Sequence, residues 1–91
     1  MSEKLDRLRA ELLVAEAKVE AYIGESHKLV REAWVCVSSA FGSAFEMQEI
    51  ADKHRATGNE GLAKCCESLA NAMQREAQRM AREIEHFPVI S

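Results

Sequence analysis

Apolar and small residues recur at steps of three and four along almost the whole chain, and this spacing constrains the fold most. The first such run contains Leu5, Leu8, Leu12, Ala15, Val19 and Tyr22. Steps of three and four place side chains on one side of an α-helix, whereas a half-buried strand requires alternation in steps of two. No alternation of useful length occurs. We therefore predict an all-α protein.

The same spacing continues in two further segments. The middle run contains Ser26, Leu29, Ala33, Cys36, Ala40, Ser43, Met47 and Ile50. The last run contains Leu62, Cys66, Leu69, Met73, Ala77, Met80, Ile84 and Phe87. Between these runs, Thr57-Gly58-Asn59 offers a glycine that ends one helix and a candidate N-cap for the next, and Pro88 ends the last helix. We predict helices over about 3–23, 27–56 and 60–87, with these runs facing the core, and a short tail over 88–91.

Whether the chain turns at Gly24-Glu25-Ser26 decides between two architectures. A turn gives three helices that close into a bundle as a monomer. Without a turn, a single helix of about 54 residues, roughly 80 Å long, forms a hairpin with the last helix and needs a second copy to cover its leucines. The charges of Glu20, His27 and Lys28 favour the continuous helix, because they oppose the dipoles of the helix ends that a turn creates. We favour the three-helix bundle, a single domain over residues 1–91, and keep the dimerising hairpin as the alternative.

Charge and length argue against two kinds of partner. The chain has 12 Lys and Arg residues against 15 Asp and Glu residues, a formal charge of −3. A nucleic-acid-binding domain presents a clustered positive surface, so this balance disfavours nucleic acid as a partner. The longest uncharged run, Ala33 to Phe45, is shorter than the ~20 residues that span a bilayer. We expect a soluble protein without a membrane partner.

The three cysteines, Cys36, Cys65 and Cys66, provide no disulfide framework, because their number is odd and two of them are adjacent. We expect them to be small buried side chains in a protein of the reducing cytoplasm.

Catalytic and metal-binding motifs are lacking in the sequence. Glu83 and His86 stand three residues apart, as in carboxylate-bridged di-metal bundles, but such sites need two of these pairs and further glutamates. The three histidines are scattered and do not combine with a nucleophile and an orienting group. We predict a protein that is not an enzyme and that holds neither a cofactor nor a metal.

Aromatic side chains in the middle segment are the first candidates for partner binding. Trp34, Phe41 and Phe45 form a stripe beside the run that contains Leu29 and Met47, so the apolar arc approaches half of the helix circumference. Such a helix either packs between two neighbours or presents its aromatic side chains to a partner, since Trp and Phe dominate binding hot spots.

Basic side chains on the last segment are the second candidates. They are Arg75, Arg79 and Arg82, with Lys64 and His86 beside them. Helical spacing places them away from Leu62 and Met73. They form either a solvated face with internal ion pairs or a patch for an acidic protein or a phosphate backbone, which Arg recognises well.

A small, acidic, all-helical chain with a helical pair from Ala51 to Met80, turning at Thr57-Gly58, resembles the small all-α inhibitors of phages and mobile elements, including some anti-CRISPR proteins. The resemblance implies a non-catalytic protein-binding module in the host cytoplasm. It would block a larger host defence or regulatory complex by steric occlusion. The alternative is a homodimeric helical regulator that binds nucleic acid through the Arg-rich face.

Overall fold

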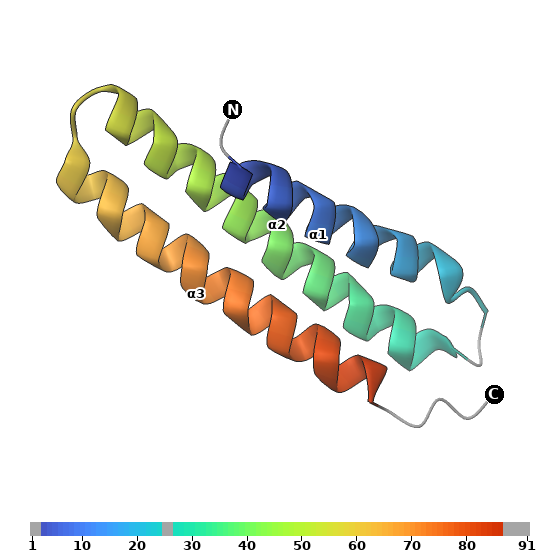
Figure 1. Cartoon of the computed structure of the whole chain (residues 1–91). Helices are drawn as coiled ribbons and strands as arrows, with labels where there is room; N and C mark the ends of the chain where they lie inside the picture. Colours follow the sequence, from blue (N-terminus) through green and yellow to red (C-terminus); the bar gives the residue numbers. More distant parts are fainter. Residues whose placement is uncertain (1–2, 25–26, 87–91) are drawn as a thin grey trace.

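The described part of the computed structural model, residues 3–24 and 27–86, forms three α-helices and no strand. The helices are α1 (Glu3–Ala21), α2 (Lys28–Ala56) and α3 (Glu60–Glu85), which run antiparallel in sequence order (Figure 1). The Cα atoms extend over 52 × 18 × 17 Å, so the bundle is elongated. The predicted all-α three-helix bundle is confirmed. Ser26, Phe87 and the tail over 88–91, to which the sequence also gave roles, lie outside the described residues.

The chain turns between α1 and α2 at Gly24. Its φ of +105° lies in the left-handed region, which glycine adopts easily and a continuous α-helix does not contain. The rings of Tyr22 and His27 meet edge to face across this turn, with centroids 5.6 Å apart. The alternative prediction, one long helix up to Ala56, is therefore wrong.

The turn between α2 and α3 is a Schellman motif, as the glycine at this position suggests. Gly58 has a φ of +85°, and its N–H donates to the Arg55 carbonyl oxygen. The Asn59 N–H donates to the His54 carbonyl oxygen at 2.8 Å. Asn59 precedes α3, but its side chain makes no capping hydrogen bond. The turn joins α2 and α3 into an antiparallel hairpin.

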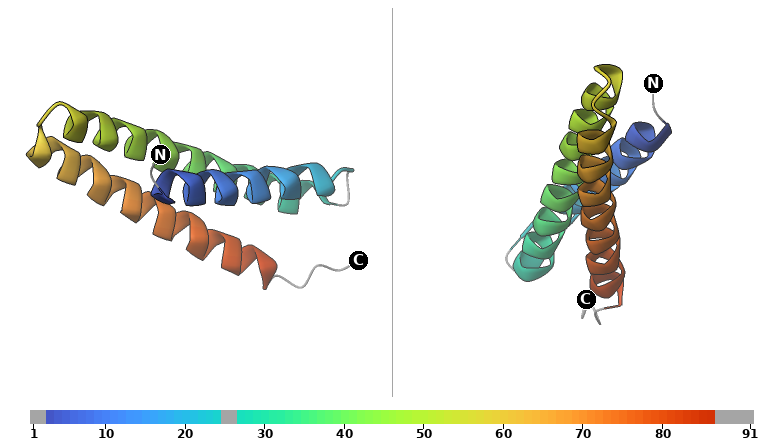
Figure 2. Two further views of the ribbon diagram at one scale, coloured as in Figure 1. Left: turned by 45° about the horizontal axis from the view of Figure 1, so that its top comes forward. Right: turned by 90° about the vertical axis from the view of Figure 1, so that its left-hand side faces the viewer.

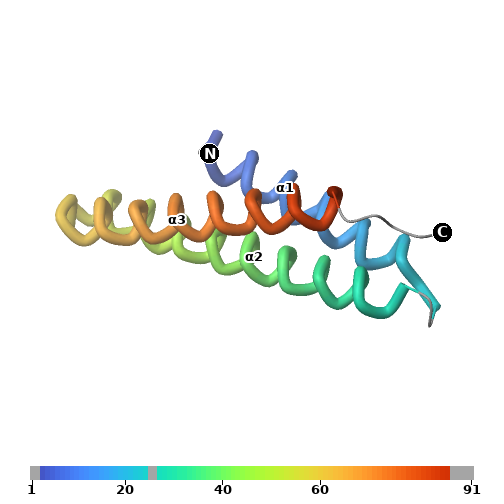
Figure 3. Tube along the Cα trace, turned by 90° about the horizontal axis from the view of Figure 1, so that it is seen from below, coloured from blue at the N-terminus to red at the C-terminus, as the bar shows by residue number. Residues whose placement is uncertain are grey.

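The central helix is α2, which packs against both other helices, whereas α1 and α3 contact each other little (Figures 2 and 3). In addition, α1 covers only part of the hairpin. Lys4, in the first turn of α1, lies 3.9 Å from Glu67 of α3, and the end of the hairpin nearest the α2–α3 turn extends beyond it (Figure 2). The bundle therefore has three helices over most of its length and two at the end nearest the α2–α3 turn.

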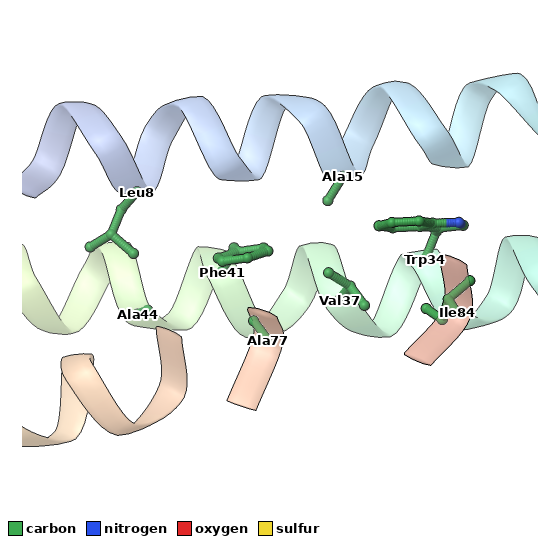
Figure 4. Packing of buried hydrophobic residues seen from close by; sticks show 8 residues of the cluster. All are labelled: Leu8, Ala15, Trp34, Val37, Phe41, Ala44, Ala77 and Ile84. Atoms are coloured by element: carbon green, nitrogen blue, oxygen red, sulfur yellow. The ribbon is translucent and has the colours of Figure 1, made fainter. Parts of the chain in front are cut away.

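The hydrophobic core follows the central helix. Its buried members are Leu8, Ala15, Trp34, Val37, Phe41, Ala44, Ala77 and Ile84 (Figure 4). In α3 the buried positions are seven residues apart, at Ala63, Ala70, Ala77 and Ile84. Because alanine is small, this row allows the α2 and α3 backbones to approach closely.

The buried row of α2 differs from the predicted one. Its members are Trp34, Val37, Phe41, Ala44, Gln48 and Ala51. In contrast, Leu29 is 81% exposed and Cys36, Ser43 and Ile50 are also exposed. The prediction that these four face the core is wrong. Two apolar rows lie side by side on this helix, and the row with the aromatic residues is buried because it removes more apolar area from water.

Two predictions for α3 and the cysteines are also wrong. Leu62 and Leu69 are exposed, because the alanine row beside them takes the position against α2. Cys36 and Cys65 are exposed and Cys66 is partly buried, whereas burial was expected for all three. Cys36 lies in the displaced row of α2, which explains its exposure.

A polar cluster joins α2 to α3 where α1 begins. The buried Gln48 donates from Nε2 to Asp52 at 3.0 Å and to Glu67 at 3.3 Å, and Arg55 donates to Glu67 at 3.4 Å. The hydrogen bond from Gln48, with the nearby Lys4 and Arg55 cations, lowers the pKa of Glu67. This cluster fixes which residues of the two helices lie level with each other.

Candidate functional site

A groove of about 530 Å³ opens between α1 and α3. It exists because these two helices lie on either side of α2 with little contact between them. Its lining comes from all three helices: Ala10, Glu11, Val14, Ala15, Trp34, Phe41, Gln78, Ala81, Arg82 and Glu85. Its volume is in the range of about 300–1,000 Å³ that is typical of ligand sites.

The walls of the groove include small residues, and two hydrogen bonds link the helices that form them. Ala10 on α1 and Ala81 on α3 leave the space between the helices unfilled. Gln74 and Gln78 of α3 donate to the two carboxylate oxygens of Glu11 at 2.6 and 2.7 Å. Hydrogen bonds to a charged acceptor are stronger than neutral ones. These two hydrogen bonds therefore hold α1 and α3 at a fixed separation.

The floor of the groove is aromatic. Trp34 and Phe41 of α2 line it but are only 3% and 4% exposed. Ala15 of α1 and Ile84 of α3 belong to the same packed cluster as Trp34 (Figure 4). The ammonium group of Lys18 lies 5.8 Å from the centroid of the Trp34 ring, within the range of a cation–π contact. The indole thus connects α1 with α3 beneath the groove.

Trp34 also carries a buried donor without a partner. Its Nε1 makes no hydrogen bond with any described residue. Leaving such a group unpaired costs about 1–3 kcal/mol. The indole is therefore stabilised in the core by its apolar contacts and by the cation–π contact with Lys18.

The rim of the groove carries two charges of opposite sign. Arg82 and Glu85 of α3 are both exposed, and neither forms an ion pair with another described residue. Within the part of the chain that the structure describes, both charges of the rim are therefore uncompensated.

The basic stripe of α3 is exposed as predicted, but one of its arginines is compensated. Arg79 donates from Nη1 to Glu83 at 2.7 Å and also binds Glu76. The hydrogen bonds that Arg79 donates to Glu76 raise the pKa of Arg79 and lower the pKa of Glu76. Arg79 lies between two carboxylates, which leaves Arg75 and Arg82 as the cations that this stripe offers.

Three of the six predicted partner-binding residues meet in the groove. Trp34 and Phe41 form its floor and Arg82 its rim. The two aromatic side chains are core residues, however, and the interpretation that they form an exposed docking face in the free protein is wrong. Phe45 is half-buried beside Leu12 and Leu13 on the other side of α1.

Residues of α1 and the outer edge of α3 complete the groove and were not predicted from the sequence. They are Glu11, Val14, Gln78 and Glu85. Of these four residues, only Val14 could have been found from the sequence, because the run Leu12-Leu13-Val14 widens the apolar arc of the first helix beyond a single row. The others are ordinary polar helix residues that only the packing brings together.

No three His, Cys, Asp or Glu side chains within the described ranges gather closely enough to hold a metal ion. None of the three described helices has the length and apolar content needed to cross a bilayer. No protein-family model matches the chain, and neither a curated protein nor a solved structure is detectably similar to it.

Proposed function

We propose that this protein is a non-catalytic protein-binding module whose groove takes an amphipathic helix of a larger protein. The observation that carries the proposal is the groove itself, with Trp34 and Phe41 as its floor and Arg82 on its rim. An amphipathic helix that lays its apolar side into a hydrophobic groove is a recurrent form of peptide recognition.

The partner helix would lie between α1 and α3 as the fourth helix of the bundle. Its apolar side chains would fill the space between Ala10 and Ala81, above the aromatic floor. A carboxylate of the segment would meet Arg82, since Arg binds carboxylates through two hydrogen bonds, and a cation of the segment would meet Glu85. An amphipathic segment with charges of both signs beside its apolar side is therefore the chemistry that fits this groove.

The proposed role is inhibition of a larger complex by steric occlusion, as the resemblance to phage and mobile-element inhibitors implies. A segment held in the groove is unavailable for its own contacts, and the 52 Å length of the bundle would cover neighbouring surface. The alternative role, nucleic-acid binding through the Arg-rich face, has weaker support, because Glu76 and Glu83 compensate Arg79.

Filling the groove tests the proposal. We expect Ala81→Phe to abolish capture of the protein partner from a lysate of the host cells, because the new ring occupies the partner's space. The matched control is Ala72→Phe, which adds the same ring at an exposed position of α3. Capture is read by mass spectrometry, and circular dichroism checks that both variants keep the helical content of the parent.

A charge reversal on the rim gives a second measurement on the same partner. We expect Arg82→Glu to weaken the affinity about tenfold, equivalent to about 1.4 kcal/mol. The control Arg31→Glu changes an exposed arginine of α2, outside the groove lining. The proposed site would be refuted if both groove variants captured the partner as efficiently as the two controls.

A further inference from the structure

The α2–α3 hairpin has a second apolar face, on the side away from α1. We propose that this hairpin face is the interface of a homodimer. It consists of Leu29, Cys36, Ser43 and Ile50 of α2 and Leu62 and Leu69 of α3, with Met47, Cys66 and Met73 half-buried between them. The proposal concerns a different surface from the groove and does not depend on the proposed function.

The position of this face follows from helix geometry. Lys18 of α1 lies over Trp34, and Glu11 of α1 binds Gln74 and Gln78, so α1 lies against one edge of each helix of the hairpin. At about 100° per residue, the Leu29 row of α2 lies on the edge away from α1, beyond the buried row. The same geometry puts Leu62 and Leu69 of α3 on the edge away from Gln74 and Gln78.

The two edges form one continuous patch. The hydrogen bond from Gln48 to Glu67 sets the level of the antiparallel helices, so that Ile50 lies level with Cys65, between Leu62 and Leu69. These three large side chains are 42%, 54% and 51% exposed, respectively. From Ala33 to Phe45, α2 carries no charged residue on any side. Contiguous apolar surface of this kind marks an interaction site in soluble proteins.

The size of the face fits a second copy. On α2 the face extends about 32 Å from Leu29 to Ile50, and on α3 about 17 Å from Leu62 to Met73, each about 10 Å wide. One copy therefore contributes about 500 Å², and two copies bury roughly 1,000 Å², the least that a specific interface needs. A dimer of two hairpins would have the layout of a four-helix bundle, with α1 of each copy on the outside.

The pattern of side chains along α2 suits two-fold symmetry about Ser43. An antiparallel copy would then place Ile50 against the small Cys36 of the other copy, and this contact occurs twice, as an isologous interface requires. The same symmetry would bring Lys53, near the end of α2, close to the level of Glu32 of the other copy. Lys53 and Glu32 have opposite charges, and a parallel arrangement would instead oppose like ends.

Sedimentation of charge variants tests the dimer. We expect the parent protein to sediment as a dimer at micromolar concentration and the double variant Leu62→Lys/Leu69→Lys as a monomer with unchanged helical content. The control Leu13→Lys/Ile23→Lys places the same two charges at exposed positions outside the hairpin face and should remain dimeric. A parent protein that sediments as a monomer, or a Leu62→Lys/Leu69→Lys variant that remains a dimer, would overturn the proposal.

Cross-linking gives a readout that does not depend on the stability of the lysine variant. In a chain with Cys36, Cys65 and Cys66 replaced by serine, we expect Ser43→Cys to form an intermolecular disulfide on mild oxidation. Ala17→Cys, at an exposed position of α1, should remain monomeric under the same conditions. Equal cross-linking at both positions, or none at Ser43→Cys, would argue against the two-fold arrangement.

Discussion

Replacing Trp34 with alanine is expected to lower the free energy of unfolding by about 3–5 kcal/mol, the usual cost of truncating a buried aromatic side chain. The indole is the largest side chain in the core and contacts the cluster shared by all three helices. Its loss leaves a cavity beneath the groove that the alanines around it do not fill. Because a domain of this size is stable by only about 5–10 kcal/mol, the variant should be close to unfolding.

Urea unfolding followed by circular dichroism measures this change without relying on the lost fluorophore. Ile23→Ala is the control, because it removes a large apolar side chain that is 74% exposed and lies outside both the groove and the hairpin face. The control should alter the unfolding free energy by less than about 0.5 kcal/mol. Similar effects of the two substitutions would show that the Trp34 indole is not part of the core.

Replacing Ala70 with leucine is expected to destabilise the protein by about 1–3 kcal/mol, the usual cost of overpacking a filled core. Ala70 is fully buried in the alanine row of α3, close to the level of Ala44 on α2. Three added carbon atoms at this position force the two backbones apart.

The matched control for the alanine row is Ala72→Leu, which makes the same change at an exposed position two residues away. Leucine and alanine both favour the helix, so the control should change stability little. Thermal and urea unfolding of the two variants can be compared directly. An Ala70→Leu variant as stable as the parent would mean that α2 and α3 do not pack through this row.

The core of α1 could be predicted from the sequence, whereas that of α2 could not. In α1 the predicted row contains the buried Leu8 and Ala15, with Leu12 and Val19 partly buried against the core. In α2 two apolar rows lie next to each other, and spacing alone does not say which of them faces the neighbouring helices. The positions of α1 and α3 decide this, and they are a property of the whole bundle.

The core of α3 shows a second limit of predicting buried residues from hydrophobic spacing. Hydrophobicity favours Leu62 and Leu69 as core residues, yet Ala63 and Ala70, beside them, are buried. Small side chains are favoured where two helices approach closely, because dispersion contacts between the backbones compensate for the smaller apolar area that the side chains bury. A prediction from the spacing of large apolar residues does not include these backbone contacts.

Several residues of the candidate site were predicted from the sequence, but their position in one groove was not. Trp34, Phe41 and Arg82 were singled out for their chemistry, on two different helices. Their meeting in one groove depends on the turn at Gly24, which positions α1 against α2, and on Ala10 and Ala81, which leave the space between α1 and α3 unfilled. Glu11 and Gln78 carry no signal of their own, because their hydrogen bond spans 67 residues of sequence.

Nuclear Overhauser effects from the Trp34 indole protons most directly test whether this side chain joins the two outer helices beneath the groove. The protein has a single tryptophan, so its ring signals are unambiguous. Cross-peaks to the methyl groups of both Ala15 on α1 and Ile84 on α3 are the expected result. Cross-peaks to neither residue, together with rapid exchange of the indole N–H proton with solvent, would contradict the proposed core and the groove above it.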